Sequence, residues 1–331
     1  MNLRSAWFLV ACLAAVTSLT DCTGGEKGSG DKPGVLKIAV IPKGMTHEFW
    51  KAIHAGAAQA AAELGVEIMW KGPQREDDRA QQITVVEDVI SRGVAGIVLA
   101  PLDDRALIRP VQDAMRERIP VVIIDSGLQG KDYLSFVATD NYQGGVLAAR
   151  HMGALLGGKG RIFMIRYQEG SASTTDRECG FLETAVKEFP GLQFLVKDQH
   201  AGTTTETAYQ LAENLLGRFP DVEGIFCPNE SSTFGTLRAL QESRLAGKVK
   251  YVGFDSSPKL VQALRDGHLH GLILQNPVKM GYLGVTEIVQ HLRGQKIPER
   301  VDTGVYLATR DNMDTPEIKA LLSPDLSILD R

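Results

Sequence analysis

Short apolar segments recur along this chain, and each is followed by a segment whose apolar residues have helical spacing. Val35 to Ile41, Ala95 to Leu99 and Val121 to Ile124 consist almost entirely of apolar residues and do not alternate with polar ones. Such strands are typical of a parallel sheet covered on both faces by helices. At 331 residues the chain exceeds the usual size of one core, so the pattern predicts two doubly wound α/β lobes.

The repeated pattern predicts where each lobe begins and ends. A helix from Thr46 to Leu64 and a strand from Val66 to Trp70 follow the first strand, and the pattern restarts near Val137. Further first-lobe helices are expected at 77–92 and at 105–118. In the second lobe, strands are expected at 161–166, 194–197, 222–227 and 250–254, and helices at 141–156, 173–189, 204–219, 231–244 and 258–265.

The end of the chain is expected to return to the first lobe. Residues 269–275 predict a closing strand, 278–293 a returning helix and 301–307 a last strand, followed by a surface tail with a short helix at 318–322. The predicted lobes are therefore 35–139 plus 276–306, and 140–275 plus 307–331. Several crossings between lobes favour a hinge over an independent linker.

The N-terminal residues have the pattern of an export signal. Arg4 supplies a positive charge before the apolar run from Ala6 to Leu19, which is too short for a confident membrane span. Residues 1–22 are predicted to be the signal, and Leu19 to Cys22 is similar to a bacterial lipobox except for Asp21. Two outcomes stay open, lipidation of Cys22 and a freely soluble exported protein. Residues 23–34 are rich in Gly and Ser and predict a flexible tether.

Charge and motif content exclude several function classes. A formal net charge of -4 gives no basic stripe for nucleic acid, which is not an expected partner. The chain contains no paired CxxC, HxxxH or GxSxG pattern and no cofactor fingerprint, so we expect no metal, no cofactor and no catalysis. Cys179 and Cys227 are expected to be buried free thiols, with a disulfide as the alternative.

Polar residues follow matching strands in the two halves of the chain. Asp125 ends one apolar strand and Asp255 ends another, and each is preceded in the sequence by a similar Gly-Ile-containing strand that ends at proline, Pro101 or Pro228. Ligands of open α/β sheets bind at the carboxyl ends of the strands. Two such edges facing each other predict a cleft. The segment from Lys37 to Trp50 is expected to place two adjacent aromatic residues at its mouth.

Several motifs carry a family resemblance. In chain order they are Thr46 to Trp50, Ile124-Asp125, Arg177 to Phe181, Pro228 to Glu230, Val252 to Asp255, and Gln275. With this order and spacing, the chain from Val35 to about Leu307 resembles the periplasmic sugar-binding proteins of the ribose-binding, LacI-like type. The resemblance implies a protein that captures a monosaccharide between two lobes and delivers it to an ATP-driven importer in the membrane.

The resemblance also implies which residues contact the ligand. By match to the family's motifs, the stacking aromatics are Phe49 and Trp50 and the hydroxyl-binding carboxylates are Asp125 and Asp255. The remaining polar positions are His47, Ser126, Arg177, Asn229 and Gln275. His47 replaces an asparagine of the ribose type and Ser126 an arginine, which implies a polyhydroxylated ligand other than ribose.

Simpler roles remain open for several of these residues. The alternative for Trp50 is a core position, for each of the two aspartates a helix N-cap, and for Arg177 a solvated helix face. The acidic cluster from Glu76 to Asp78 is interpreted as charge at a helix N-terminus.

The expected protein is a monomeric, non-catalytic binding protein of the periplasm or cell envelope. Its expected partners are a small sugar or polyol and the permease of an ABC importer, and it contacts the membrane only through a lipid on Cys22, if that residue is modified. Alternatives are a sensory protein that signals to a receptor kinase or chemoreceptor, an enzyme, and a transcriptional regulator. A regulator needs an N-terminal helix-turn-helix, where this chain has the signal-like segment.

Overall fold

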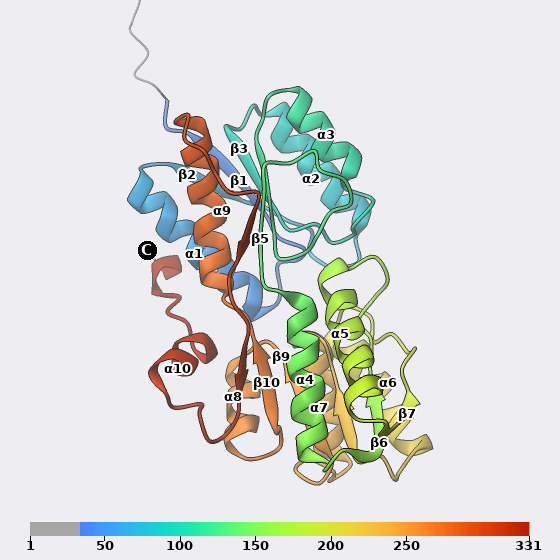
Figure 1. The fold of residues 1–331 in the computed structure, drawn as a ribbon. Helices are drawn as coiled ribbons and strands as arrows, with labels where there is room; N and C mark the ends of the chain where they lie inside the picture. The colour runs from blue at the N-terminus through green and yellow to red at the C-terminus, as the bar shows by residue number, and fades with distance from the viewer. Residues whose placement is uncertain (1–33, 331) are drawn as a thin grey trace, which may run out of the picture. The chain divides into compact units, whose positions relative to one another are not determined.

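The computed structural model describes residues 34–330, so the predictions for the signal, Cys22 and nearly all of the tether lie outside the described residues. The described residues contain two six-stranded sheets that belong to two lobes (Figure 1). This confirms the predicted fold class of two α/β lobes built on parallel sheets.

The first sheet is parallel throughout, with the strand order β11-β5-β4-β3-β1-β2. Its strands are β1 (Lys37–Ile41), β2 (Glu67–Trp70), β3 (Gly96–Leu99), β4 (Val121–Ile124), β5 (Ser135–Ala138) and β11 (Arg300–Asp302). Four helices cover it: α1 (Glu48–Leu64), α2 (Arg79–Ser91), α3 (Ile108–Arg116) and α9 (Pro277–Leu292).

Both faces of this sheet are buried, as its apolar strands predict. Ile38 and Val40 of β1 pack with α1 and α9, whereas Ala39 and Ile41 pack with α2 and α3. Successive side chains of a strand point to opposite faces, so each face needs its own layer of helices. Helix α1 ends at Gly65, whose φ of 70° is in the left-handed region that glycine adopts without strain.

The second sheet has the strand order β12-β10-β9-β8-β6-β7. Its strands are β6 (Lys159–Met164), β7 (Gly191–Val196), β8 (Gly224–Phe226), β9 (Lys250–Phe254), β10 (Gly271–Leu274) and β12 (Tyr306–Ala308). Helices α4 (Asn141–Leu155) and α5 (Ala172–Glu188) cover one face. Helices α6 (Thr205–Arg218), α7 (Glu230–Glu242) and α8 (Pro258–Arg265) cover the other. Only the edge strand β12 is antiparallel to its neighbour.

The chain passes between the sheets after β5, after β10 and between β11 and β12. Figure 1 shows α9 lying beside α1 in the first lobe, far from α1 in the sequence. The single last strand predicted at 301–307 is wrong. Gly304, with a φ of 93°, breaks that segment into β11 and β12, which join different sheets. Strand β5 was not predicted, because four residues including a serine carry little periodicity.

The C-terminal tail contains α10 (Pro316–Leu322) and a short 3-10 helix, η1 (Ser327–Asp330). Ile318 and Leu322 are buried in the core of the second lobe, and η1 contacts α1 of the first. Within residues 34–330, no helix has both the length and the apolar character needed to cross a membrane. Both cysteines are free thiols, as expected, but only Cys227 is buried; the predicted burial of Cys179 is wrong, because this residue is half-buried.

Candidate ligand-binding site

A cavity with an empty volume of about 330 Å³ lies between the lobes and is lined by both. We call it the cleft. The carboxyl ends of β1, β4 and β9 and the N-terminal turns of α1, α5 and α7 meet at it. The lining residues are Lys43, His47, Phe49, Trp50, Glu76, Asp125, Tyr167, Ser173, Thr174, Arg177, Asn229, Glu230, Asp255 and Gln275.

The two strand-end aspartates occupy equivalent places in their lobes. Asp125 follows β4 and Asp255 follows β9, and both are buried with left-handed backbones, at φ values of 63° and 68°. A non-glycine residue in this region costs on the order of 1–2 kcal/mol, which the surrounding structure offsets. Neither aspartate is a helix N-cap, because Asp140 and Ser257 cap the helices that follow.

Asp125 is paired with a lysine that sequence reasoning did not single out. Lys43 Nζ lies 3.0 Å from Asp125 Oδ2, and both side chains are about 4% exposed. The same ammonium group donates a hydrogen bond of 3.0 Å to Ser173 Oγ in the second lobe. A buried charge needs such partners, because an unpaired one is costly in a low-dielectric interior.

Asp255 has its own set of partners. Gln275 Nε2 donates to Asp255 Oδ1 at 2.7 Å, and the backbone N–H of Glu230 donates to Oδ2 at 3.0 Å. Burial raises the pKa of Asp255, and the charge of Arg177 opposes this rise. Gln275 Oε1 is buried and has no partner among the described residues.

Arg177 is a buried residue of α5, so the predicted alternative of a solvated arginine is wrong. Its Nε donates to Asn141 Oδ1 at 2.8 Å and its Nη1 to the Pro228 carbonyl at 2.9 Å. The guanidinium carbon lies 4.0 Å from the centre of the Phe254 ring. Burial lowers the pKa of Arg177, and nearby carboxylates oppose that effect. Arg177 Nη2 is buried and has no partner among the described residues.

Phe49 and Trp50 lie in the first turn of α1 and both line the cleft. Their rings meet edge to face with centroids 5.0 Å apart and an interplanar angle of 83°. Both residues also belong to the hydrophobic core of the first lobe. Each therefore lies in the core and lines the cleft at the same time. The Trp50 indole N–H donates to Glu76 Oε1 at 2.6 Å, which fixes the orientation of the ring.

Glu76 is the centre of a buried polar cluster. It accepts from Trp50 and from the Tyr167 hydroxyl of the second lobe, and its Oε1 lies 2.6 Å from His47 Nδ1. Burial alone would lower the pKa of His47, but the Glu76 carboxylate outweighs it and raises that pKa to about 9. Burial likewise opposes the ionisation of Glu76, but His47 and the donors lower its pKa to about 2. The two groups therefore form an ion pair at neutral pH.

Glu230 links the lobes through the backbone of α1. From the first turn of α7, its carboxylate accepts the N–H of Phe49 at 3.0 Å and the N–H of Glu48 at 3.3 Å. Burial raises the pKa of Glu230 to about 7, opposed by the charge of His47. The N-cap residue of α7 is Asn229, whose Oδ1 accepts the N–H of Ser232.

The structure brings eight of the nine predicted ligand-contacting residues to the cleft. The exception is Ser126, which is buried and whose hydroxyl accepts the N–H of Ser173 from the second lobe. Sequence reasoning missed Lys43, Glu76, Tyr167, Ser173, Thr174 and Glu230.

The interpretation of the acidic cluster was wrong for one of its residues. Asp78 is the N-cap residue of α2 and so places negative charge at the start of that helix, as interpreted. Glu76, by contrast, lines the cleft. Its position in the loop that follows a strand end was the available signal. Tyr167, which follows β6, is an aromatic residue of the second lobe that lines the cleft.

The cleft contains no recognisable cofactor or metal arrangement. Among residues 34–330, no group of three or more His, Cys, Asp or Glu side chains is placed to hold a metal ion. What the cleft offers is a dense set of donors and acceptors beside the aromatic rings of Phe49, Trp50 and Tyr167. Its two unpartnered buried atoms are complementary, since Arg177 Nη2 donates and Gln275 Oε1 accepts.

Comparison with known protein families agrees with this geometry. Residues 38–296 match the periplasmic binding protein domain family. The chain belongs to this family. Because the match spans both lobes and the helix α9 that returns to the first, it includes the whole cleft.

Individual relatives cover most of the chain. The ribose import binding protein of Escherichia coli (strain K12) is 28% identical over 276 residues, which are 82% of this chain and 90% of that protein. The D-allose-binding periplasmic protein of the same strain is 29% identical over 269 residues, 79% of this chain and 86% of that protein.

Among solved structures, a carbohydrate transporter solute binding protein from Agrobacterium radiobacter in complex with D-arabinose is 34% identical. It has a TM-score of 0.85 and covers 88% of this chain and 100% of that chain.

Proposed function

We propose that this protein captures a monosaccharide or a related polyol in the cleft and delivers it to an ABC importer. The observation that carries the proposal is the pair of buried, unpartnered atoms in the cleft, Arg177 Nη2 and Gln275 Oε1. A buried polar atom without a partner costs about 1–3 kcal/mol. A hydroxyl group both donates and accepts, so a polyol satisfies both atoms and removes that cost.

The other cleft residues support the same class of ligand. Asp125 and Asp255 supply acceptors for hydroxyl protons, and Lys43 and Arg177 supply donors. The faces of Phe49 and Trp50 suit the C–H face of a sugar ring. Each charge-assisted hydrogen bond contributes about 1.5–3 kcal/mol, so a few suffice for micromolar binding.

The relatives support transport in preference to signalling. Those described above are named for sugar import or sugar binding. We therefore place the protein in the periplasm or cell envelope, with an importer permease as its partner. The sensory alternative has no observation in its favour.

Several finer proposals accompany this function. We propose that the protein is a non-catalytic monomer, that Cys22 carries a lipid anchor, and that the lobes divide after residues 139, 275 and 306. The proposed ligand-contacting residues are His47, Phe49, Trp50, Asp125, Ser126, Arg177, Asn229, Asp255 and Gln275.

A thermal-shift and calorimetric screen tests the proposed function. Pentoses, hexoses, polyols and inositols, including D-ribose, D-allose and D-arabinose, are added to the purified full chain. We expect at least one to bind one to one, unchanged, and to raise the Tm, since a ligand selective for the folded form stabilises it. Chemical conversion of the bound sugar, or the failure of every compound to bind, would contradict the proposal.

An Asp255→Ala variant assigns the binding to the cleft. It leaves the Gln275 amide and the Glu230 N–H unpaired, so we expect a loss of about 2 kcal/mol or more in binding free energy. Asp266→Ala, at an exposed position after α8, is the matched control and should bind as wild type.

A further inference from the structure

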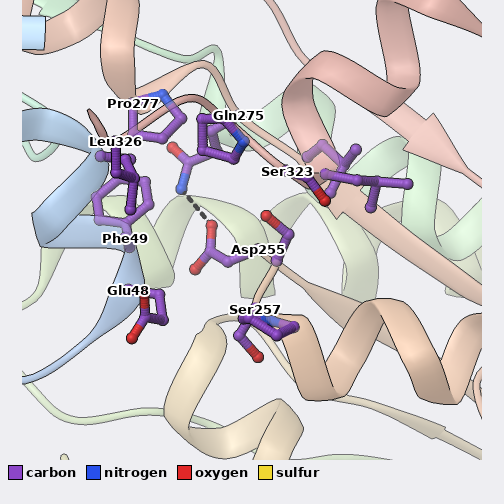
Figure 2. A pocket seen from close by; sticks show the side chains of 14 residues that line it. Glu48, Phe49, Asp255, Ser257, Gln275, Pro277, Ser323 and Leu326 are labelled. Atoms are coloured by element: carbon purple, nitrogen blue, oxygen red, sulfur yellow. Dashed lines mark hydrogen bonds between the residues drawn. The ribbon is translucent and has the colours of Figure 1, made fainter. Parts of the chain in front are cut away.

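A second cavity, with an empty volume of about 660 Å³, adjoins the cleft. Phe49, Asp255 and Gln275 line both cavities. Figure 2 shows these three among the residues that line the second cavity. We call the second cavity the tail cavity, because the C-terminal tail closes one side of it. Its remaining lining residues are Glu48, Ala52, Ser256, Ser257, Pro258, Leu274, Pro277, Leu322, Ser323, Pro324 and Leu326.

The tail cavity differs from the cleft in chemistry. The cleft is lined by charged and hydrogen-bonding side chains, whereas most of the tail cavity's wall is apolar. Ala52 comes from α1 of the first lobe, Leu274 and Pro277 from the crossing after β10, and Leu326 from the tail. Phe49 and Leu326 both line this cavity (Figure 2).

The tail is held in place as a wall of this cavity. Its α10 buries Ile318 and Leu322 in the core of the second lobe. Ser256 Oγ donates to the Leu321 carbonyl at 3.3 Å, and Arg265 pairs with Asp314 at 2.9 Å. The cavity is therefore bounded by packed elements on each of these sides.

Gln275 lines both the polar cleft and the largely apolar tail cavity. Its Nε2 is bonded to Asp255, while its buried Oε1 has no partner among the described residues. A ligand hydroxyl that donates to this oxygen lies at the junction, with polar groups on one side and apolar wall on the other. An occupant of both cavities is therefore polar at one end and apolar at the other.

We propose that the tail cavity is a subsite for an apolar substituent on the bound sugar, such as the alkyl or aryl group of a glycoside. The inference rests on the proposed function, since the sugar ring occupies the cleft. It extends the ligand class from free sugars to sugar derivatives. The apolar group removes its own surface and that of the cavity wall from water, which favours binding.

The first test compares free sugars with their derivatives. D-ribose, D-allose and D-arabinose, and the methyl and phenyl glycosides of each in both anomeric forms, are titrated into the full chain by calorimetry. For a sugar that binds, we expect one phenyl glycoside to bind at least as tightly as the free sugar. If no subsite adjoins the cleft, the phenyl ring has no space there and the phenyl glycoside does not bind. Rejection of every phenyl glycoside, with free sugar still bound, would overturn the inference and leave the proposed function standing.

A pair of variants then places the aryl group. Ala52 lines the tail cavity and not the cleft, so Ala52→Leu narrows the tail cavity from α1, and we expect phenyl glycoside binding to fall by roughly tenfold and free sugar binding to stay unchanged. Ala62→Leu, at an exposed position of the same helix, is the control and should change neither.

Leu326→Trp fills the cavity from the tail and should act as Ala52→Leu does, which covers the case in which one variant fails to fold. If both variants weaken free sugar and glycoside equally, or weaken neither, the subsite is wrong. Absence of binding by every compound of the wider screen and by every glycoside would overturn the proposed function and the subsite with it.

Discussion

At the scale of single residues, four of the buried charged groups in the cleft form two pairs. Lys43 pairs with Asp125, and His47 pairs with Glu76. In both pairs the partners come from different segments of the first lobe, and in both a second-lobe hydroxyl joins the pair, from Ser173 or Tyr167. The charged side chains are therefore part of the contact between lobes as well as of the ligand site.

The ion pair of His47 and Glu76 makes stability depend on pH. The pKa of His47 is raised from 6.5 to about 9, so its contribution is complete below pH 6.5 and is lost as the pH rises through 9. The pKa of Glu76 is lowered from 4.5 to about 2, so its contribution is present above pH 4.5 and is lost as the pH falls through 2. Between pH 4.5 and 6.5 both contributions are complete.

We expect the free energy of unfolding, measured with urea, to fall by about 1–3 kcal/mol more in wild type than in His47→Asn between pH 6.5 and 9. The comparison with the variant removes the effect of groups that titrate in this range independently of His47. Glu230 is not one of them, because the charge of His47 opposes the rise in its pKa. If the free energy of unfolding changes with pH in the same way in both proteins, the ion pair of His47 and Glu76 does not cause the pH dependence.

At the scale of elements, glycines set how closely the helices pack. A Cβ on Gly180 of α5 would overlap the Tyr142 carbonyl of α4, and one on Gly145 of α4 would overlap the Arg177 carbonyl. The first lobe repeats this arrangement, because Gly56 of α1 faces α9 and Gly281 of α9 faces α1. In each lobe two helices thus approach until their backbones touch.

This packing positions Arg177 in the cleft. Gly180→Ala should push α5 away from α4, lower the free energy of unfolding by about 1–3 kcal/mol and weaken sugar binding. The matched control is Gly217→Ala in α6, where a Cβ meets nothing within 4 Å. There we expect a gain of about 0.5–1 kcal/mol from helix propensity. Urea unfolding measures both, and equal effects of the two variants would contradict the role of the contact.

The N-terminus of α1 is capped from the other lobe. Its own N-cap residue, His47, makes no side-chain cap bond, and Glu230 accepts two of the first backbone N–H groups instead. Glu230→Ala leaves these donors unpaired and frees the turn that holds Phe49, so we expect sugar binding to weaken by about 1–2 kcal/mol. Glu87→Ala, exposed on α2, is the control. If calorimetry gives Glu230→Ala the same affinity for sugar as wild type, the cap that Glu230 provides for α1 does not contribute to sugar binding.

At the scale of the molecule, several hydrogen bonds between the lobes lie at the cleft. Tyr167 to Glu76, Lys43 to Ser173 and Phe49 to Glu230 all cross from one lobe to the other. Since the chain passes between the sheets three times, it forms a hinge in place of a single tether.

We expect a sugar that binds to shift the population toward this closed arrangement. Small-angle X-ray scattering of the full chain should show a smaller radius of gyration on saturation with that sugar. The Glu230→Ala variant should need more sugar for the same change. An unchanged radius in wild type, with binding shown by calorimetry, would argue against closure.

Local patterns in the sequence were sufficient for the repeated elements and for the strand-end residues. Apolar strands and helical spacing depend only on neighbouring residues, and β9 and α8 have the bounds that the pattern predicts. Asp125 and Asp255 could be placed at the cleft because parallel strands end at one edge of a sheet. By contrast, β5, β11 and β12 are too short to carry a period, and the sheets alone define them.

The sequence by itself therefore determined two α/β lobes with a polar cleft at their facing edges. Tertiary structure decided which residues share that cleft and what adjoins it. Tyr167 meets Glu76 across 91 residues and Glu48 meets Glu230 across 182, and no local pattern relates positions so far apart. The tail cavity likewise depends on tertiary structure, because residues of the tail lie beside α1 and line it together with residues from β10, α9 and the loop after β9.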